Sequence, residues 1–140
     1  MWNSITLEGI RGRVADLEIT IRPEEGQNMY RKFALRFAQD AEYQTALSFR
    51  PHESVLKIDR KFSGSRRAII HQRRCLVNST DGELKLRVIL DRYSAEVFIN
   101  DGEQVMTCTM YTDQRADGIS FFADGQVDMD VVKYDLVMDE

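Results

Sequence analysis

Two carboxylates, Asp91 and Glu96, stand close together in the sequence. A pair of carboxyl groups on either side of a scissile bond is what glycoside hydrolysis requires. Here, however, Asp91 falls at the end of one predicted strand and Glu96 partway along the next, with nothing nearby to form a sugar cleft. We therefore expect structural roles, in which Asp91 caps a turn by accepting backbone N–H bonds and Glu96 pairs across the strands with a neighbour such as Arg87. No residue is predicted to be catalytic.

The segment from Arg60 to Arg74 is strongly basic and contains no acidic residue. Guanidinium groups hold phosphate through paired hydrogen bonds, so the segment is a candidate for binding a phosphorylated sugar or an acidic surface. The alternative, which we favour, is a solvated strand face or a docking face for a partner domain. The arginines concerned are Arg60, Arg66, Arg67, Arg73 and Arg74.

The histidines and cysteines give no metal-ligand pattern. His52 and His71 are too far from any Cys, His or Asp cluster, so no metal and no cofactor is expected. Cys108 alternates with apolar residues and should point inward as a small apolar side chain. Cys75 follows arginines, which predicts a thiol more acidic than usual. Two cysteines without a signal segment favour free thiols and a cytoplasmic location over a disulfide.

Scattered aromatic residues leave two interpretations open. They could stack on sugar rings, as in carbohydrate-binding modules, or they could be core and strand-pair residues, which is the more common case in a sandwich. These residues are Trp2, Tyr30, Tyr43, Tyr93 and Tyr111.

The elements that position these residues are strands, and the clearest are in the stretch 86–110. Apolar residues alternate with others on both sides of Asp91, and Asp101-Gly102 supplies the positive φ angles of a tight hairpin turn. The turn at Arg92-Tyr93 is harder to type, because neither residue readily adopts positive φ. A consistent register pairs Leu86 with Ile99, Val88 with Val97, Leu90 with Ala95, Ala95 with Cys108, and Val97 with Met106. All eight side chains should share one buried face.

Further alternating runs predict about ten short strands, which is typical of a β-sandwich or barrel. A helix competes only between Arg31 and Ala46, where Phe33, Phe37 and Ala41 also fall at helical spacing; the strict alternation on both sides favours strands. The other runs are Ala15 to Ile21, Val55 to Asp59, Arg67 to Val77, Ile119 to Ala123 and Val127 to Val137.

Length and composition indicate one globular domain over residues 1–140. The 140 residues are enough for a two-layer core, and 43% apolar with 30% charged residues is ordinary for a globular chain. A net charge of −4 argues against binding to nucleic acid or to an anionic membrane. No run is long enough to span a membrane, and no signal segment is visible at the N-terminus, which again predicts a cytoplasmic protein.

The sequence D-R-Y-S-A-E-V-F-I-N-D-G-E at 91–103 resembles the signature of the C-terminal β-sandwich module of glycoside hydrolase family 32. That family includes invertases, sucrose-6-phosphate hydrolases, levanases and inulinases. Further similarity occurs in I-D-R-K-F-S-G at 58–64 and G-I-S-F-F-A-D-G at 118–125. The resemblance implies an antiparallel two-sheet β-sandwich similar to the legume-lectin, jelly-roll type. The residues that match the family motif are Asp91, Ser94, Glu96, Val97, Phe98, Gly102 and Thr107.

Enzymes of this family carry their catalytic carboxylates on a preceding propeller domain. Their Asn-Asp-Pro-Asn-Gly-type, Arg-Asp-Pro and Glu-Cys motifs do not occur in this chain. The resemblance therefore implies a non-catalytic ancillary module of a β-fructofuranosidase or sucrose-6-phosphate hydrolase, with the propeller as its partner. A carbohydrate-binding module and an independent enzyme are the alternatives.

A module separated from its propeller should expose a face that the propeller would cover. We expect such a chain to self-associate, as a homodimer or otherwise, either through exposed strand edges or through apolar residues near the N-terminus. The residues concerned are Trp2, Ile5, Leu7 and Ile10.

Overall fold

The computed structural model describes residues 2–5, 12, 14–39, 44–59, 72–77, 81–109 and 117–135. Within them the chain forms strands and turns and no helix, so no helix there could cross a membrane. The strands are β1 (Trp2–Ile5), β2 (Ala15–Pro23), β3 (Lys32–Gln39), β4 (Thr45–Arg50), β5 (Val55–Asp59), β6 (Gln72–Leu76), β7 (Leu84–Leu90), β8 (Ser94–Ile99), β9 (Gln104–Thr109), β10 (Gly118–Asp124) and β11 (Val127–Asp135).

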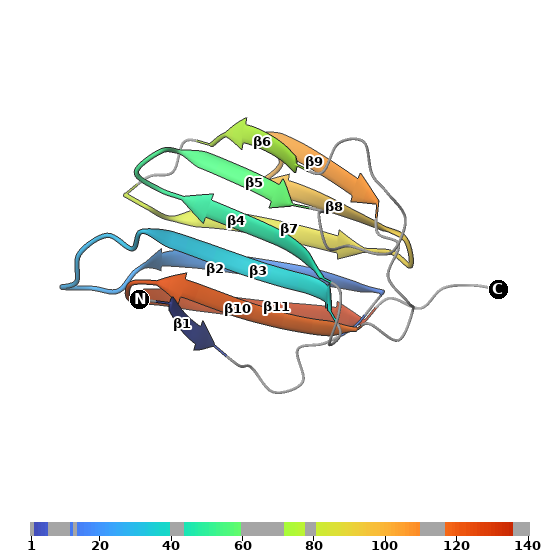
Figure 1. Ribbon diagram of the computed structural model, residues 1–140, viewed down its shortest axis with the longest axis horizontal. Coiled ribbons are helices and arrows are strands. Elements are labelled where there is room, and N and C mark those ends of the chain that lie inside the picture. The colour runs from blue at the N-terminus through green and yellow to red at the C-terminus, as the bar shows by residue number, and fades with distance from the viewer. Residues whose placement is uncertain are drawn as a thin grey trace.

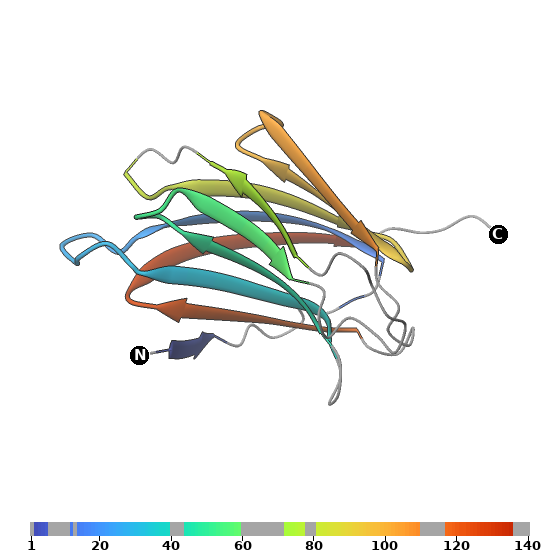
Figure 2. The same ribbon diagram turned by 45° about the horizontal axis from the view of Figure 1, so that its top comes forward.

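The strands form two antiparallel sheets that pack face to face (Figures 1 and 2). The six-stranded sheet has the order β1-β10-β3-β4-β5-β6, and the five-stranded sheet has the order β11-β2-β7-β8-β9. The described strands do not close into a barrel. The predicted all-β, two-sheet sandwich is therefore confirmed, as is the prediction of strands rather than a helix at Lys32–Gln39 and Thr45–Arg50.

The β7–β8–β9 meander has the register that alternation predicts. Leu86 pairs with Ile99 and Val88 with Val97 on one side of β8, while Val97 pairs with Met106 on the other. The shared buried face is confirmed because all eight side chains are at most 8% exposed. Burying each of the larger ones contributes about 1.5–3 kcal/mol.

The turns of the meander use two different backbone conformations. Asp101 and Gly102 have φ angles of 60° and 85°, as predicted, and the preceding Asn100 is also positive at 49°. Asn100 is tied to β7, because its N–H donates to the Lys85 carbonyl at 2.8 Å and its Oδ1 accepts from the Lys85 N–H at 3.2 Å. The Arg92-Tyr93 turn keeps ordinary negative φ, and its Asp91 N–H donates to the Ser94 carbonyl at 2.9 Å.

Both sheets contribute side chains to the core. The six-stranded sheet supplies Phe33, Phe37, Phe49 and Phe121, and a loop adds Tyr30, all fully or almost fully buried. The Tyr30 hydroxyl donates to the Gly82 carbonyl at 2.7 Å, so its polar end is satisfied inside the core.

The sheets are joined along one side by β6 and β9, which are edge strands. Gln104 Nε2 donates to the Leu76 carbonyl at 2.8 Å, and Cys75 Sγ lies 3.4 Å from Met106 Sδ. Both Cys75 and Cys108 are free thiols, as predicted. The prediction of an acidic Cys75 is wrong, because its side chain turns toward the core and burial raises its pKa, while Arg73 and Arg74 are exposed.

Candidate site on the outer face of the five-stranded sheet

The residues of the family motif other than Val97 point away from the core. On β8, Ser94, Glu96 and Phe98 alternate with the buried Ala95, Val97 and Ile99. Thr107 on β9 pairs with Glu96 and is also exposed. The motif therefore defines part of the outer face of the five-stranded sheet, and its polar residues add little to the core of this domain.

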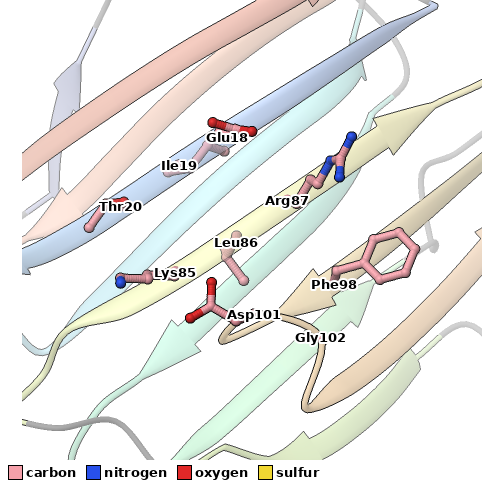
Figure 3. A pocket seen from close by; sticks show the side chains of 9 residues that line it. All are labelled: Glu18, Ile19, Thr20, Lys85, Leu86, Arg87, Phe98, Asp101 and Gly102. Carbon is pink, nitrogen blue, oxygen red and sulfur yellow. The ribbon is translucent and has the colours of Figure 1, made fainter.

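An open groove of about 460 Å³ crosses this outer face (Figure 3). It runs over β2, β7 and β8 and reaches the β8–β9 turn. The motif residues Phe98 and Gly102 line it, whereas Asp91 and Glu96 do not. The full lining is Glu18, Ile19, Thr20, Lys85, Leu86, Arg87, Phe98, Asp101 and Gly102.

Strand pairing explains why these residues meet. Register places Glu18 beside Arg87, and Arg87 beside Phe98, in a single row across β2, β7 and β8. The row therefore puts a carboxylate, a guanidinium and an aromatic ring on neighbouring strands. Such a set can hydrogen-bond hydroxyl groups and pack against an apolar ring face.

Arg87 is fixed by an ion pair with Asp16 on β2. Its Nε donates to both carboxylate oxygens at 3.1 and 3.2 Å, and a terminal nitrogen donates to Oδ2 at 2.6 Å. The Asp16 side chain is only 9% exposed, so the guanidinium covers the carboxylate. The side-chain hydrogen bonding between Arg87 and Asp16 raises the pKa of Arg87, and the negative charge of Asp16 raises it further. The predicted pairing of Arg87 with Glu96 is therefore wrong, because β2 lies on the other side of β7 and offers a nearly buried acid.

Asp91 has the turn-capping contact expected of it. Its Oδ1 accepts a hydrogen bond from the Arg92 N–H at 2.6 Å at the start of the β7–β8 turn. Glu96 is exposed in the middle of β8, facing Ile89 on one neighbour and Thr107 on the other. The two carboxylates thus lie at different places on the sheet, and neither lines the groove.

The basic segment is described only in part. Arg60, Arg66 and Arg67 lie outside the described residues. Arg73 and Arg74 are both exposed on β6, and as consecutive strand residues they point to opposite faces. Arg74 pairs with Lys57 on the six-stranded sheet, so the two arginines do not converge on one site.

Metal-ligating groups do not gather in the part of the chain that the structure describes. No three His, Cys, Asp or Glu side chains there are close enough to hold a metal ion. Of the aromatic candidates, Tyr30 is a core residue and Tyr93 is 60% exposed at the β7–β8 turn, while Tyr43 and Tyr111 lie outside the described residues.

Sequence reasoning did not single out Asp16, Glu18, Thr20 or Lys85. These residues occupy the polar positions of two alternating runs, and alternation predicts that their side chains face outward. It does not predict that β2 and β7 are neighbours in the sheet.

Comparison with known proteins agrees with the fold and the motif. The profile of "Glycosyl hydrolases family 32 C terminal" matches residues 2–137. The chain is 31% identical over 131 residues to sucrose-6-phosphate hydrolase of Staphylococcus xylosus, covering 93% of this chain and 26% of that protein. It is 26% identical over 125 residues to levanase of Bacillus sp. (strain L7), covering 85% of this chain and 13% of the levanase.

Solved structures show the same fold. Exo-inulinase from Aspergillus awamori superposes with a TM-score of 0.77 at 18% identity, covering 98% of this chain and 29% of that one. Sucrose-6-phosphate hydrolase from Lactobacillus gasseri gives 0.73 at 21% identity, with 90% and 25% covered.

These features define a β-sandwich domain, and the chain spans only about a quarter of the length of the Staphylococcus relative. The chain belongs to the C-terminal domain family of glycosyl hydrolases family 32.

Proposed function

We propose that this chain is the non-catalytic sandwich of a β-fructosidase that cleaves sucrose, sucrose 6-phosphate or fructan, and that it supports the stability of the catalytic domain by packing against it. The main support for this proposal is that residues 2–137 match the C-terminal domain family of glycosyl hydrolases family 32. The chain also covers only 26% of the Staphylococcus relative. The position of Asp91 and Glu96 outside the groove supports a non-catalytic role.

The outer face of the five-stranded sheet is the surface that we assign to the catalytic domain. It carries the family motif, and it mixes charged residues with apolar ones, including the half-buried Phe98 and Val105, which is 52% exposed. Interfaces between domains of one chain have this mixed character. Most of the length of the relatives lies outside the matched region, which supplies an occupant for the face.

A chimera tests this proposal. The sandwich of the Staphylococcus sucrose-6-phosphate hydrolase is replaced by this chain, and sucrose 6-phosphate hydrolysis and thermal inactivation are measured. We expect the chimera to be active and more heat-resistant than the enzyme truncated before its sandwich. In the chimera, Val105→Asp should lower the inactivation temperature, whereas the control Leu76→Asp, at an exposed apolar residue on the other sheet, should not.

The isolated chain tests the non-catalytic role separately. It should release no fructose from sucrose, sucrose 6-phosphate or levan. Fructose release that Glu96→Gln abolishes would overturn the proposal, as would a chimera no more stable than the truncated enzyme.

A carbohydrate-binding role is the second candidate, because Phe98 lines the groove together with the charged residues Glu18, Arg87 and Asp101. Glycan-array binding that Phe98→Ala removes would favour it over a purely structural role.

We also propose a cytoplasmic location, which the two free thiols support because thiols persist in a reducing compartment.

A further inference from the structure

A second recess lies on the outer face of the six-stranded sheet, away from the family motif. The β3–β4–β5 register places Ala34, Ser48 and Lys57 in one row across the sheet. The next row in one direction contains Arg36, Ala46 and Asp59, and Lys32 lies on β3 in the other direction. Small side chains thus form the floor of a recess of about 180 Å³. Its border is made by Lys32, Arg36, Lys57, Gln44 and the carboxylate of Asp59.

The floor is recessed although it faces outward. Ala34 is 6% exposed and Ser48 is 7% exposed, as low as residues of the core. Long basic side chains beside small ones extend along the sheet and cover them while their charged ends remain at the surface. The cationic groups of Lys32, Arg36 and Lys57 are therefore held around the recess.

Arg36 is oriented by a second contact. Its guanidinium carbon lies 4.3 Å from the centre of the Phe122 ring on β10. Stacking of this kind limits the rotation of the guanidinium but leaves its N–H donors available at the edge of the plane.

Charge is concentrated on this face. The chain as a whole has a net charge of −4. On the strands of this face, the cations outnumber the carboxylates of Asp59 and Asp124. The cations are Lys32, Arg36, Arg50, Lys57 and Arg74.

The recess is also unfavourable for the positive charge of Lys32. The pKa of Lys32 is lowered, first by burial and then by the positive charges of Arg50, Lys57 and Arg36, against which Asp59 acts only partly. A bound anion would relieve this repulsion.

We propose that this recess binds a dianionic phosphate group, either free phosphate or the phosphate of a phosphorylated sugar. The recess is bordered by three cations and one carboxylate, and the cations can donate to the terminal oxygens of a phosphate monoester. The Ser48 hydroxyl on the floor is a further donor. The small floor accommodates such a group better than an extended acidic protein surface. This inference does not depend on the proposed function.

Calorimetric titration of the 140-residue chain tests the proposal with inorganic phosphate, glucose 6-phosphate and glucose. We expect saturable binding of both phosphates and none of glucose at the same concentrations. Tighter binding of glucose 6-phosphate would assign the site to a sugar phosphate, and equal binding would assign it to phosphate alone. Affinity should rise as pH increases through about 6, because the second proton of a phosphate monoester is lost there.

Variants locate the site. Lys57→Gln and Arg36→Gln should each weaken phosphate binding about tenfold, because each removes a charge-assisted hydrogen bond. Arg22→Gln is the matched control, since Arg22 is a cation on the other sheet that pairs with Asp130. Circular dichroism should show that all three variants are folded.

Three results would overturn the proposal. One is the absence of saturable phosphate binding, and another is an equal loss of affinity in Arg22→Gln. The third is tighter binding of a polyglutamate peptide that phosphate cannot displace, which would assign the face to an acidic protein surface.

Discussion

Tyr30 is fully buried, and within the described residues its hydroxyl makes one polar contact. Its hydroxyl donates to the Gly82 carbonyl, and burial raises its pKa well above the ordinary value of about 10. The neutral phenol is therefore the form that the folded chain accepts. Gly82, which supplies the carbonyl, has a φ of 81°, a backbone conformation that residues other than glycine rarely adopt.

We expect Tyr30→Phe to lower the free energy of unfolding by about 1–2 kcal/mol, because it leaves the Gly82 carbonyl without its donor. Above pH 10 the unfolded chain loses the phenolic proton while the folded chain keeps it. Stability of the native protein should therefore fall as pH rises past 10, and the Phe variant should lack this part of the decline. Urea unfolding at pH 7 to 11 measures both effects. Parallel pH curves for the two proteins would contradict the assignment.

The ion pair of Arg87 with Asp16 gives a second prediction. Arg87→Ala should reduce the urea midpoint, since it uncovers a carboxylate that is almost buried. Arg87→Lys should restore only part of the loss, because an ammonium cannot reach both oxygens in the same geometry. Arg22→Ala is the control, because its pair with Asp130 is 41% and 69% exposed and should matter little. Equal effects of Arg87→Ala and Arg22→Ala would show that burial of Asp16 does not matter.

Single residues were predicted well where alternation decides their orientation. The outward position of Ser94, Glu96 and Phe98 follows from the buried residues between them. Partners were predicted poorly. Arg87 forms its ion pair with Asp16 and not with Glu96, because β2 pairs with β7. That strand pairing joins segments that are far apart in the sequence.

The β8–β9 turn shows how a hairpin can be attached to a third strand. Asn100 exchanges two hydrogen bonds with Lys85 and holds a positive φ, so it both shapes the turn and ties it to the start of β7. Asn tolerates the left-handed conformation better than most residues.

Substitutions at Asn100 separate these two roles. Asn100→Ala should destabilise the fold by about 1–2 kcal/mol, since it adds backbone strain and removes the side-chain acceptor. Asn100→Gly relieves the strain but not the loss of the acceptor, so it should be the milder change. Thermal unfolding of both variants gives the comparison. If Gly proves as harmful as Ala, the side-chain bond and not the backbone conformation is what matters.

The strands were largely predictable, and the irregularity within them was not. Alternation located nearly every described strand, including the helix-like window of β3. The register shift between β3 and β10 could not be predicted from the sequence. It occurs beside Ala38, whose φ is 48°, and an alanine does not indicate that backbone conformation. The recess around Ser48 was missed for a related reason, since it needs three strands in register rather than one motif.

Exposed apolar side chains gather on the edge strands of the sandwich. Leu76 on β6 is 72% exposed, Val105 on β9 is 52% exposed, and Val132 and Tyr134 lie exposed on β11. Within the described residues, no strand pairs with the outer edge of β11, and edges that carry apolar side chains favour pairing between copies.

We therefore expect the isolated chain to self-associate with rising concentration. The physical reason is that both unpaired backbone groups and apolar side chains become covered on pairing. Sedimentation velocity over a wide concentration range measures the effect, and Val132→Lys combined with Tyr134→Lys should weaken it. A strict monomer at high concentration would contradict the expectation. The predicted part of Leu7 and Ile10 in this association falls outside the described residues.

The order of strands within the sheets has a consequence for how the protein is made. β2 lies between β7 and β11, and β3 lies between β10 and β4. During synthesis on a ribosome, β2 and β3 emerge long before their partners β11 and β10. Each of the two therefore has one unpaired edge until the last strands emerge. The nascent chain is thus most open to wrong pairing and to chaperone capture just before synthesis of this domain ends. Slowing translation ahead of residue 118 would prolong that vulnerable period.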